Sequence, residues 1–287
     1  MKTVFIATDF SVASENATKY GIAMASDLGL KIVLFNAYQV PLSIPESFTI
    51  VRPEEVKSTA EGYLKEAAMA YKKSSLQPIE ILAVEGYPTD SIVRNAKKYD
   101  DAIIVTGMKG EGTTIRKIFG STVLSLVRKS KMPMLVVPEK AEYKSIENMA
   151  LAAEVDPKLN LSCINPLVQI CEKFHSKVYV VRVLKTHSDI IDELIYRSER
   201  LSKKLEHFKL EYKFPRADNV TYALEEFIAT HHIDMLGVIP QHHNILERVF
   251  IKSETKELAF YTRVPMLLMP ELKIGQAVEE NQMQEKV

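Results

Sequence analysis

The sequence of 287 residues has little cysteine, no net charge and no long hydrophobic run. Its two cysteines, Cys163 and Cys171, lie eight residues apart on a predicted helix. A rise of about 1.5 Å per residue separates them by roughly 12 Å, which excludes a disulfide. The spacing fits neither a zinc site nor a redox pair, so both are predicted to be buried small apolar residues.

The absence of net charge excludes whole classes of partner. Lys plus Arg and Asp plus Glu both number 37, so nothing draws the whole chain to nucleic acid or to anionic lipid. No apolar run reaches the roughly 18 residues of a membrane-spanning helix. The N-terminal MKTVFIATDFS is typical of a buried strand ending in a turn rather than of a signal peptide. We therefore expect a cytoplasmic protein with no nucleic-acid or membrane partner.

Histidine and glycine are distributed unevenly. All seven histidines lie after Tyr143, so the first half has no Ser-His-Asp or Cys-His catalytic set. Eight of the ten glycines precede Tyr143, and only Gly237 and Gly275 follow it. Because glycine permits positive φ and close backbone approach to a ligand, the ligand chemistry is predicted to lie in the first half.

Short apolar runs alternate with segments of helical period, which is typical of a parallel sheet covered by helices on both faces. The strands predicted in the first half are Thr3–Thr8, Lys31–Ala37, Glu80–Val84, Ala102–Thr106 and Met134–Val137. The helices predicted between them are Ser11–Leu28 with Ser11 as N-cap, Pro53–Ser74, Thr89–Lys98 and Ser121–Ser130.

The second half repeats this order of elements. Its predicted strands are Met149–Ala153, Lys177–Leu184, Leu210–Phe214, Asp234–Val238 and Met266–Met269. Both halves end in an apolar strand that is preceded and closed by proline, at Pro133 and Pro138 and again at Pro265 and Pro270. The pattern predicts an α/β protein of two tandem open five-stranded parallel sheets, pseudo-twofold related, with domains at 1–141 and 146–271 and a flexible tail at 272–287.

One glycine-rich constellation carries the ligand chemistry. Gly107–Gly110 follows the fourth strand, and nine residues later Gly120–Thr122 opens a helix. In an open parallel sheet, ligands lie beyond the carboxyl ends of the strands. Two glycines three apart let a loop fold around an anion, while a helix N-terminus supplies amides and a positive dipole end. Phosphate binding is predicted, without the Walker lysine motif or the GxGxxG dinucleotide fingerprint.

This spacing, together with Asp9 after the first strand, resembles the universal stress protein family, whose ATP-binding members carry GxxG, nine residues and then Gly-Ser or Gly-Thr. The resemblance extends over nearly all of both halves and includes the turn Thr8–Ser11 and the segment Gly86–Pro88. It implies an adenine nucleotide alpha hydrolase-like, Rossmann-like fold that binds ATP with Mg²⁺. It also implies that the last strands, Met134–Val137 and Met266–Met269, pair antiparallel within the chain.

The resemblance assigns site residues position by position. The nucleotide-binding residues that it implies are Thr8, Asp9, Ala37, Thr106, Gly107, Met108, Lys109, Gly110, Gly120, Ser121 and Thr122. Asp9 would face the ribose or a phosphate-bound Mg²⁺, or else serve as a plain turn carboxylate. Ala37 would contact adenine through its backbone, or else merely end its strand. Lys109, Arg116 and Lys117 would pair with phosphate or remain solvated.

The second half departs from the phosphate-binding pattern. Aligning Asp234 with Asp101 places other residues at the positions of Gly107, Gly110, Gly120 and Ser121, namely Ile239, His242, Lys252 and Ser253 to within one residue. The β-branched Ile239 and the bulky His242 disfavour a tight anion-binding loop. Pro240 removes an amide donor, and Glu154 replaces Asp9. We expect no nucleotide in this half.

Two histidine pairs, His231-His232 and His242-His243, flank a strand about five residues long. Such a strand separates them by roughly 15 Å, so one metal site cannot use both. Zn²⁺ at His242 and His243 is the metal alternative, against ordinary surface histidines.

The leading interpretation is an ATP-binding stress-response protein, with dimer-like halves, that is not a dedicated enzyme and hydrolyses ATP slowly at most. The alternatives are a nucleotide-independent interaction scaffold, a metal or small-ligand sensor that uses the His-rich second half, and a flavoprotein or nucleotidylating enzyme of the same architecture. Homodimerisation of whole chains is left open.

Overall fold

A computed structural model describes seven stretches of the chain: residues 1–41, 52–73, 75–109, 115–152, 160–184, 199–240 and 264–271. The chain divides into two compact units. The first unit comprises Met1–Ser130 and Met134–Lys144, and the second comprises Lys131–Pro133 and Ser145–Val287.

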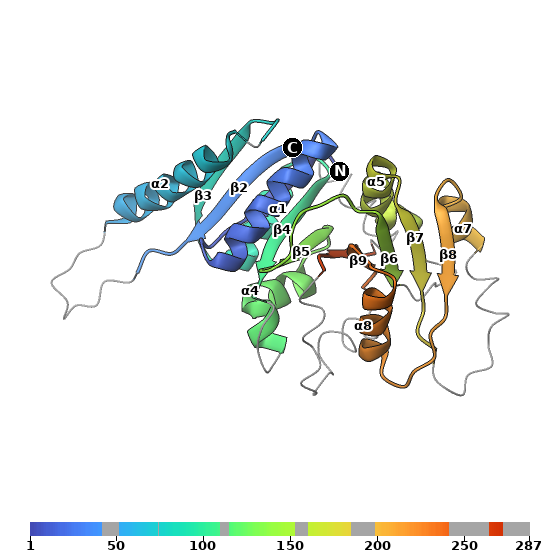
Figure 1. The fold of residues 1–287 in the computed structure, drawn as a ribbon. Helices are drawn as coiled ribbons and strands as arrows, with labels where there is room; N and C mark the ends of the chain where they lie inside the picture. Colours follow the sequence, from blue (N-terminus) through green and yellow to red (C-terminus); the bar gives the residue numbers. More distant parts are fainter. Residues whose placement is uncertain are drawn as a thin grey trace, which may run out of the picture. The chain divides into compact units, whose positions relative to one another are not determined.

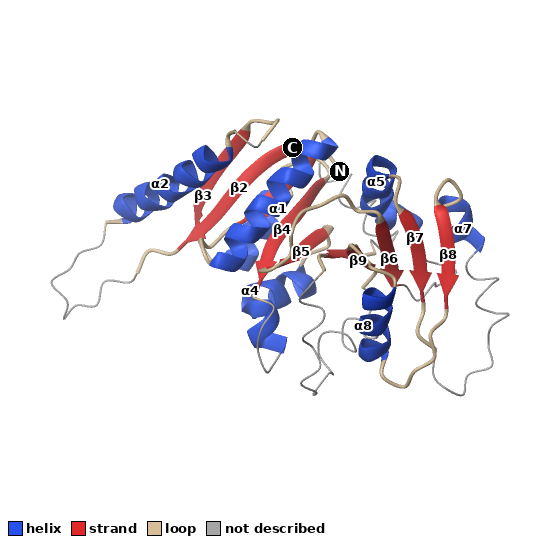
Figure 2. Ribbon diagram, viewed as in Figure 1, coloured by secondary structure: helices blue, strands red, loops and turns tan. Residues whose placement is uncertain are grey.

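The first unit alternates strands and helices along the chain (Figures 1 and 2). Its strands are β1 (Thr3–Ala7), β2 (Lys31–Tyr38), β3 (Ile79–Glu85), β4 (Ala102–Met108) and β5 (Met134–Pro138). Its helices are α1 (Val12–Leu28), α2 (Pro53–Tyr71), α3 (Pro88–Ala96) and α4 (Ile115–Lys129). Helix α1 begins after the N-cap Ser11, whose side chain accepts a hydrogen bond from the Ser14 amide, and ends at Gly29 in the left-handed conformation.

The strands of the first unit form a parallel sheet in the order β3-β2-β1-β4-β5. Helix α1 packs on β1, β4 and β5, and α2 packs on β2 and β3, whereas α3 and α4 pack on each other and on β2 and β4. The chain runs outward in one direction from β1 to β3 and then in the other direction from β4 to β5. Because crossovers between parallel strands are right-handed, α1 and α2 cover one face of the sheet, and α3 and α4 cover the other. The reversal lies between β1 and β4, where an open α/β sheet has its ligand crevice.

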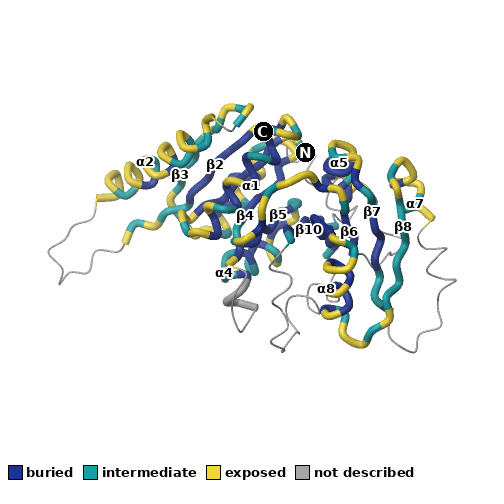
Figure 3. The backbone as a smooth tube through the Cα atoms, viewed as in Figure 1, coloured by how far each residue is buried: buried dark blue, intermediate teal, exposed yellow. Residues whose placement is uncertain are grey.

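The core of the first unit lies along its central strands (Figure 3). Every residue of β1 and of β5 is buried, as expected for strands covered on both faces, and Phe5 and Phe35 pack with ring centroids 5.0 Å apart. By contrast, most of α2 is exposed, and only Ala60 and Leu64 are buried on it.

The second unit has the strand order β10-β9-β6-β7-β8, all parallel. Its strands are β6 (Asn148–Ala152), β7 (Lys177–Val181), β8 (Lys209–Lys213), β9 (Met235–Val238) and β10 (Met266–Leu268). Its helices are the 3₁₀ helix η1 (Leu161–Ile164), α5 (Asn165–Phe174), α7 (Glu199–Lys204) and α8 (Val220–Thr230). Numbered in chain order within each unit, both sheets read 3-2-1-4-5.

Two details recur at the same register in both units. The first residue of the second strand forms an ion pair with a glutamate of the third strand, as Lys31–Glu80 at 2.7 Å and Lys177–Glu211 at 2.6 Å. In each case the glutamate pairs with the residue two positions after the lysine. The helix before each second strand also ends in the left-handed conformation, at Gly29 and at His175.

The predicted α/β fold with a parallel sheet is confirmed, and all ten predicted strands exist, with ends that differ by at most three residues from the prediction. Helix α4 begins earlier than predicted, at Ile115, but the non-helical backbone of Gly120 interrupts it, so that a regular segment restarts at the predicted Ser121. The antiparallel pairing of the last strands and the domain boundaries stay predictions.

The two cysteines are free, as predicted, although Cys163 lies in η1 and is only half-buried. Burial raises the pKa of both thiols to about 12, so they stay protonated at neutral pH. Across the described stretches, no helix combines the length and the apolar character that crossing a bilayer requires.

Candidate ligand-binding site

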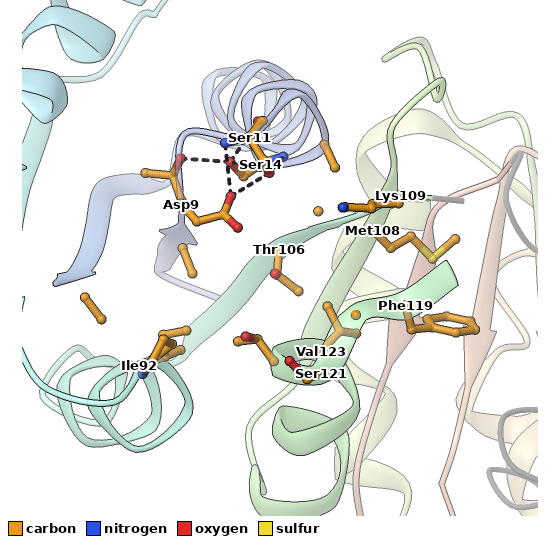
Figure 4. Close-up of a pocket in the computed structure, with 18 of the residues that line it drawn as sticks. Asp9, Ser11, Ser14, Ile92, Thr106, Met108, Lys109, Phe119, Ser121 and Val123 are labelled. Atoms are coloured by element: carbon orange, nitrogen blue, oxygen red, sulfur yellow. Dashed lines mark hydrogen bonds between the residues drawn. The ribbon is translucent and has the colours of Figure 1, made fainter. Parts of the chain in front are cut away.

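A cavity of about 340 Å³ lies at the carboxyl ends of β1, β2 and β4 (Figure 4). The first turn of α1, the start of α3 and the middle of α4 complete its wall. The residues that line it are Ala7, Thr8, Asp9, Ser11, Ala13, Ser14, Phe35, Ala37, Pro88, Ile92, Thr106, Gly107, Met108, Lys109, Phe119, Gly120, Ser121, Thr122 and Val123. Its size is in the range of small-molecule sites.

The turn after β1 is held by a network of hydroxyl groups. Asp9 Oδ1 accepts hydrogen bonds from the Ser11 amide at 3.1 Å and from Ser11 Oγ at 2.6 Å. Thr8 Oγ1 accepts from the Phe10 amide at 3.0 Å and lies 3.1 Å from Ser14 Oγ. Phe10 adopts a φ of 61°, unusual for a bulky residue, and its ring packs on Tyr63 of α2 with centroids 5.3 Å apart. The turn thereby aims the Asp9 carboxylate along the cavity wall (Figure 4).

The carboxylate of Asp9 is kept in its charged form. Partial desolvation raises its pKa, but hydrogen bonds from the side chains of Ser11 and Ser14 and from the Ser11 amide outweigh this effect. The net result is a pKa below the ordinary value, so Asp9 is an anion at neutral pH. A charged acceptor at this place can bind ligand hydroxyls or a cation.

Gly107 is required by packing within the protein. A Cβ at this position would lie 2.2 Å from the carbonyl oxygen of Ala13 and 2.8 Å from the Ser14 amide nitrogen, both backbone atoms of the first turn of α1. The close approach of α1 to β4 brings Ser11 and Ser14 into the cavity wall. The sequence predicted a ligand-binding role for Gly107. In the structure, the absence of a side chain at Gly107 lets the backbone of α1 pack closely against β4.

Gly120 has a different role. Its φ of 76° and ψ of 159° interrupt α4 in a region essentially restricted to glycine. Apart from its two chain neighbours, no atom of the described residues lies within 4 Å of the place where a Cβ would stand. Ser121 and Thr122 open the helical segment that follows, and all three residues line the cavity. Lys109 contributes a positive charge to the same wall. The hydroxyl groups of Ser121 and Thr122, the start of a helical segment and the charge of Lys109 can all stabilise a bound anionic group.

The remaining wall is apolar and comes from several elements. Phe35 and Ala37 belong to β2, Ile92 to α3, and Phe119 and Val123 to α4. The sequence predicted only Ala37 among these residues. Ser11 was identified as an N-cap and Ser14 was not singled out, because the linear sequence does not show which face of α1 meets the carboxyl end of β4.

Ten of the eleven residues predicted for the nucleotide site line this one cavity. They are Thr8, Asp9, Ala37, Thr106, Gly107, Met108, Lys109, Gly120, Ser121 and Thr122. Gly110 lies outside the described residues, and the side chains of Arg116 and Lys117 are likewise not described.

The second unit has a different residue at the position of Gly107. The last strand of each unit gives the alignment. Val136, two residues before Pro138, pairs with Thr106, and Leu268, two residues before Pro270, pairs with Val238. Ile239 therefore corresponds to Gly107, and its side chain is fully buried.

The other residues of interest in the second half, Glu154, His242, His243, Lys252 and Ser253, lie outside the described residues. Over the ranges that the structure describes, no group of three or more His, Cys, Asp or Glu side chains is placed to hold a metal ion.

Comparison with known proteins relates residues 1–138 to a known family and the whole chain to known structures by fold. Residues 1–138 match the sequence model of the Universal stress protein family. No curated protein sequence matches the chain. A universal stress protein from Archaeoglobus fulgidus DSM 4304 covers 94% of this chain and 96% of its own, with 12% identity and a TM-score of 0.69. A putative universal stress protein from Pseudomonas aeruginosa UCBPP-PA14 covers 94% of each chain, with 9% identity and a TM-score of 0.61.

A third structure is that of a universal stress protein in complex with cAMP, 28% identical over 47% of this chain and 96% of its own, with a TM-score of 0.39. The two long matches show a shared fold. The match of the family model confirms the predicted resemblance for residues 1–138.

Proposed function

We propose that the first unit binds ATP with Mg²⁺ in the cavity and that the chain is a cytoplasmic, stress-responsive binding protein rather than a dedicated enzyme. One observation carries the proposal: ten residues that the family resemblance assigns to a nucleotide lie around one cavity. They come from segments that are far apart in the sequence, so their convergence is not a trivial result of the motif.

The chemistry of the wall matches the parts of a nucleotide. Its apolar side, with Phe35, Ala37 and Ile92, suits a base, and the Asp9 carboxylate suits ribose hydroxyls or a phosphate-bound Mg²⁺. Ser121 and Thr122 follow Gly120 at the cavity wall, where their hydroxyl groups could donate hydrogen bonds to phosphate oxygens. Bound Mg²⁺ would offset the phosphate charge that faces the Asp9 carboxylate.

We further propose that the second unit is a tandem copy of the first that has lost nucleotide binding. The shared strand order and the recurring Lys–Glu pair support the duplication. The buried Ile239 at the position of Gly107 supports the loss, since its side chain occupies space that the first unit keeps for the backbone of α1.

Two measurements test nucleotide binding. Mass spectrometry of small molecules released from freshly purified protein should detect an adenine nucleotide, and calorimetric titration with MgATP should show heat of binding. Gly120→Val should abolish that heat, because valine is strained at a φ of 76° and its side chain would enter the cavity.

Gly62→Val is the matched control, since Gly62 lies in the exposed part of α2 and, outside the backbone of that helix, no described residue has an atom within 4 Å of the added carbon. Absence of released nucleotide and of heat with the wild-type protein would refute ATP binding and leave the interaction scaffold as the better account.

A further inference from the structure

A buried amide side chain lies beside the cavity without lining it. Asn36 is 7% exposed and stands on β2 between Phe35 and Ala37, which both line the cavity. Because successive side chains of a strand point to opposite faces, Asn36 points away from the face of its two neighbours. Its Nδ2 donates a hydrogen bond of 2.8 Å to the carbonyl oxygen of Thr8.

This hydrogen bond fixes the peptide plane that leads into Asp9. The Thr8 carbonyl and the Asp9 amide belong to one planar peptide unit, so holding the carbonyl also fixes the Asp9 nitrogen and Cα, from which the side chain extends to its bonds with Ser11. On the other side of Thr8, the amide donates to the Phe35 carbonyl at 2.9 Å. Thr8 is thus bonded to β2 through both of its backbone polar groups.

Burying an amide in the core carries a cost unless its hydrogen bonds are made. An apolar residue would pack more cheaply at the middle of a strand whose preceding residues, from Ile32 to Phe35, are all buried and apolar. We propose that Asn36 is a positioning residue of the ligand site, which acts through the Thr8 carbonyl to hold the Asp9 carboxylate in its bonded arrangement with Ser11. The binding arm of the test below rests on the proposed function, whereas the geometric arm does not.

The test compares Asn36→Leu with Asn95→Leu. Asn95 of α3 is 3% exposed, and its Nδ2 also donates a 2.8 Å hydrogen bond to a backbone carbonyl, that of Ser91, but it does not line the cavity. Both variants lose one buried amide, and Asn95→Leu also removes the acceptor of a 2.9 Å hydrogen bond from Lys98 Nζ, so the control should lose at least as much stability. A positioning role differs from a structural one in what happens at the Thr8–Ser11 turn.

The geometric arm is amide hydrogen exchange of Phe10 and Ser11, measured by NMR. These amides donate to Thr8 Oγ1 and Asp9 Oδ1 in the native turn. Asn36→Leu should speed their exchange roughly threefold to tenfold relative to Asn95→Leu, the scale of one lost hydrogen bond. Equal exchange at both amides in the two variants would overturn the proposal.

The binding arm is calorimetric titration with MgATP. We expect Asn36→Leu to weaken binding on the order of tenfold relative to Asn95→Leu, and equal affinities would also contradict the positioning role. If the wild-type protein does not bind MgATP, the proposed function fails while the exchange result still decides the role of Asn36. Should Asn36→Leu not fold, Asn36→Ala and Asn95→Ala provide the same comparison.

Discussion

At the residue scale, the cavity depends on two glycines for separate reasons. Gly107 has no room for a side chain, because the backbone of α1 lies against it. Gly120 has ample room but a backbone conformation that other residues rarely adopt. Packing therefore requires the first glycine and backbone conformation the second, and substitutions at the two positions should differ in what they damage.

Gly107→Ala should destabilise the protein by about 1–3 kcal/mol, since the added carbon would overlap backbone atoms that cannot rotate away. Urea unfolding monitored by circular dichroism measures this loss. Gly62→Ala on the exposed part of α2 is the control and should stabilise the protein by roughly 0.5–1 kcal/mol. Equal stability of the Gly107 variant and the wild type would show that α1 does not press on β4 as described.

Ser11→Ala should cost about 0.5–2 kcal/mol, because it removes the N-cap of α1. It also removes the 2.6 Å hydrogen bond to Asp9, so the lowered pKa of Asp9 should rise toward its ordinary value. Titration of the Asp9 carboxyl carbon by NMR provides the measurement. An unchanged pKa would mean that other donors hold the carboxylate.

At the scale of elements, an ion pair in each unit links the second and third strands near their N-terminal ends. In the first unit, Glu80 accepts from Tyr99 Oη at 2.5 Å in addition to its pair with Lys31. Burial and this bond to Glu80 raise the pKa of Tyr99 to about 12, and the bonds from Lys31 and Tyr99 lower the pKa of Glu80. Such a pair adds modest stability, because both charged side chains remain about half exposed.

Glu80→Gln should lower the free energy of unfolding by less than about 1 kcal/mol at neutral pH. The pKa of Glu80 is lower in the folded protein than its ordinary value of 4.5, so the stabilisation is complete above that value and is lost as pH falls through the lowered pKa. Unfolding curves of the variant and the wild type should therefore converge in acid. A difference that persists or grows there would assign the stabilisation to something other than charge.

The same scale shows why some elements were predictable. Strands β1 and β4 are continuous apolar runs and helix α1 has an N-cap serine, so their positions follow from local patterns. The turn of α4 before Gly120 was missed, because a glycine with positive φ normally ends a helix, whereas here a regular segment resumes at Ser121.

At the scale of the whole molecule, the sequence predicted the α/β fold from repeated patterns, and the glycine spacing with Asp9 predicted the family resemblance, which is confirmed for residues 1–138. It also predicted most of the candidate site, since those residues follow strand ends that a parallel sheet brings to one edge. Residues such as Asn36, Ser14 and Ile92 could not be found in this way. Their roles depend on side-chain direction, as in the contact of Ser14 with Thr8, and on contacts between separate elements, as in the bond from Asn36 to Thr8.

The proposed loss of nucleotide binding in the second unit predicts how many nucleotides one chain binds. The first unit keeps Gly107 against α1 and an open Gly120, while the second buries Ile239 at the position of Gly107. Two units of one strand order should therefore provide one nucleotide site per chain rather than two.

Native mass spectrometry of the full chain with MgATP tests this claim most directly. We predict one bound adenine nucleotide per chain in the wild-type protein and in Gly62→Val, and none in Gly120→Val. Two nucleotides per chain, none in the wild type, or one retained in Gly120→Val would contradict the account.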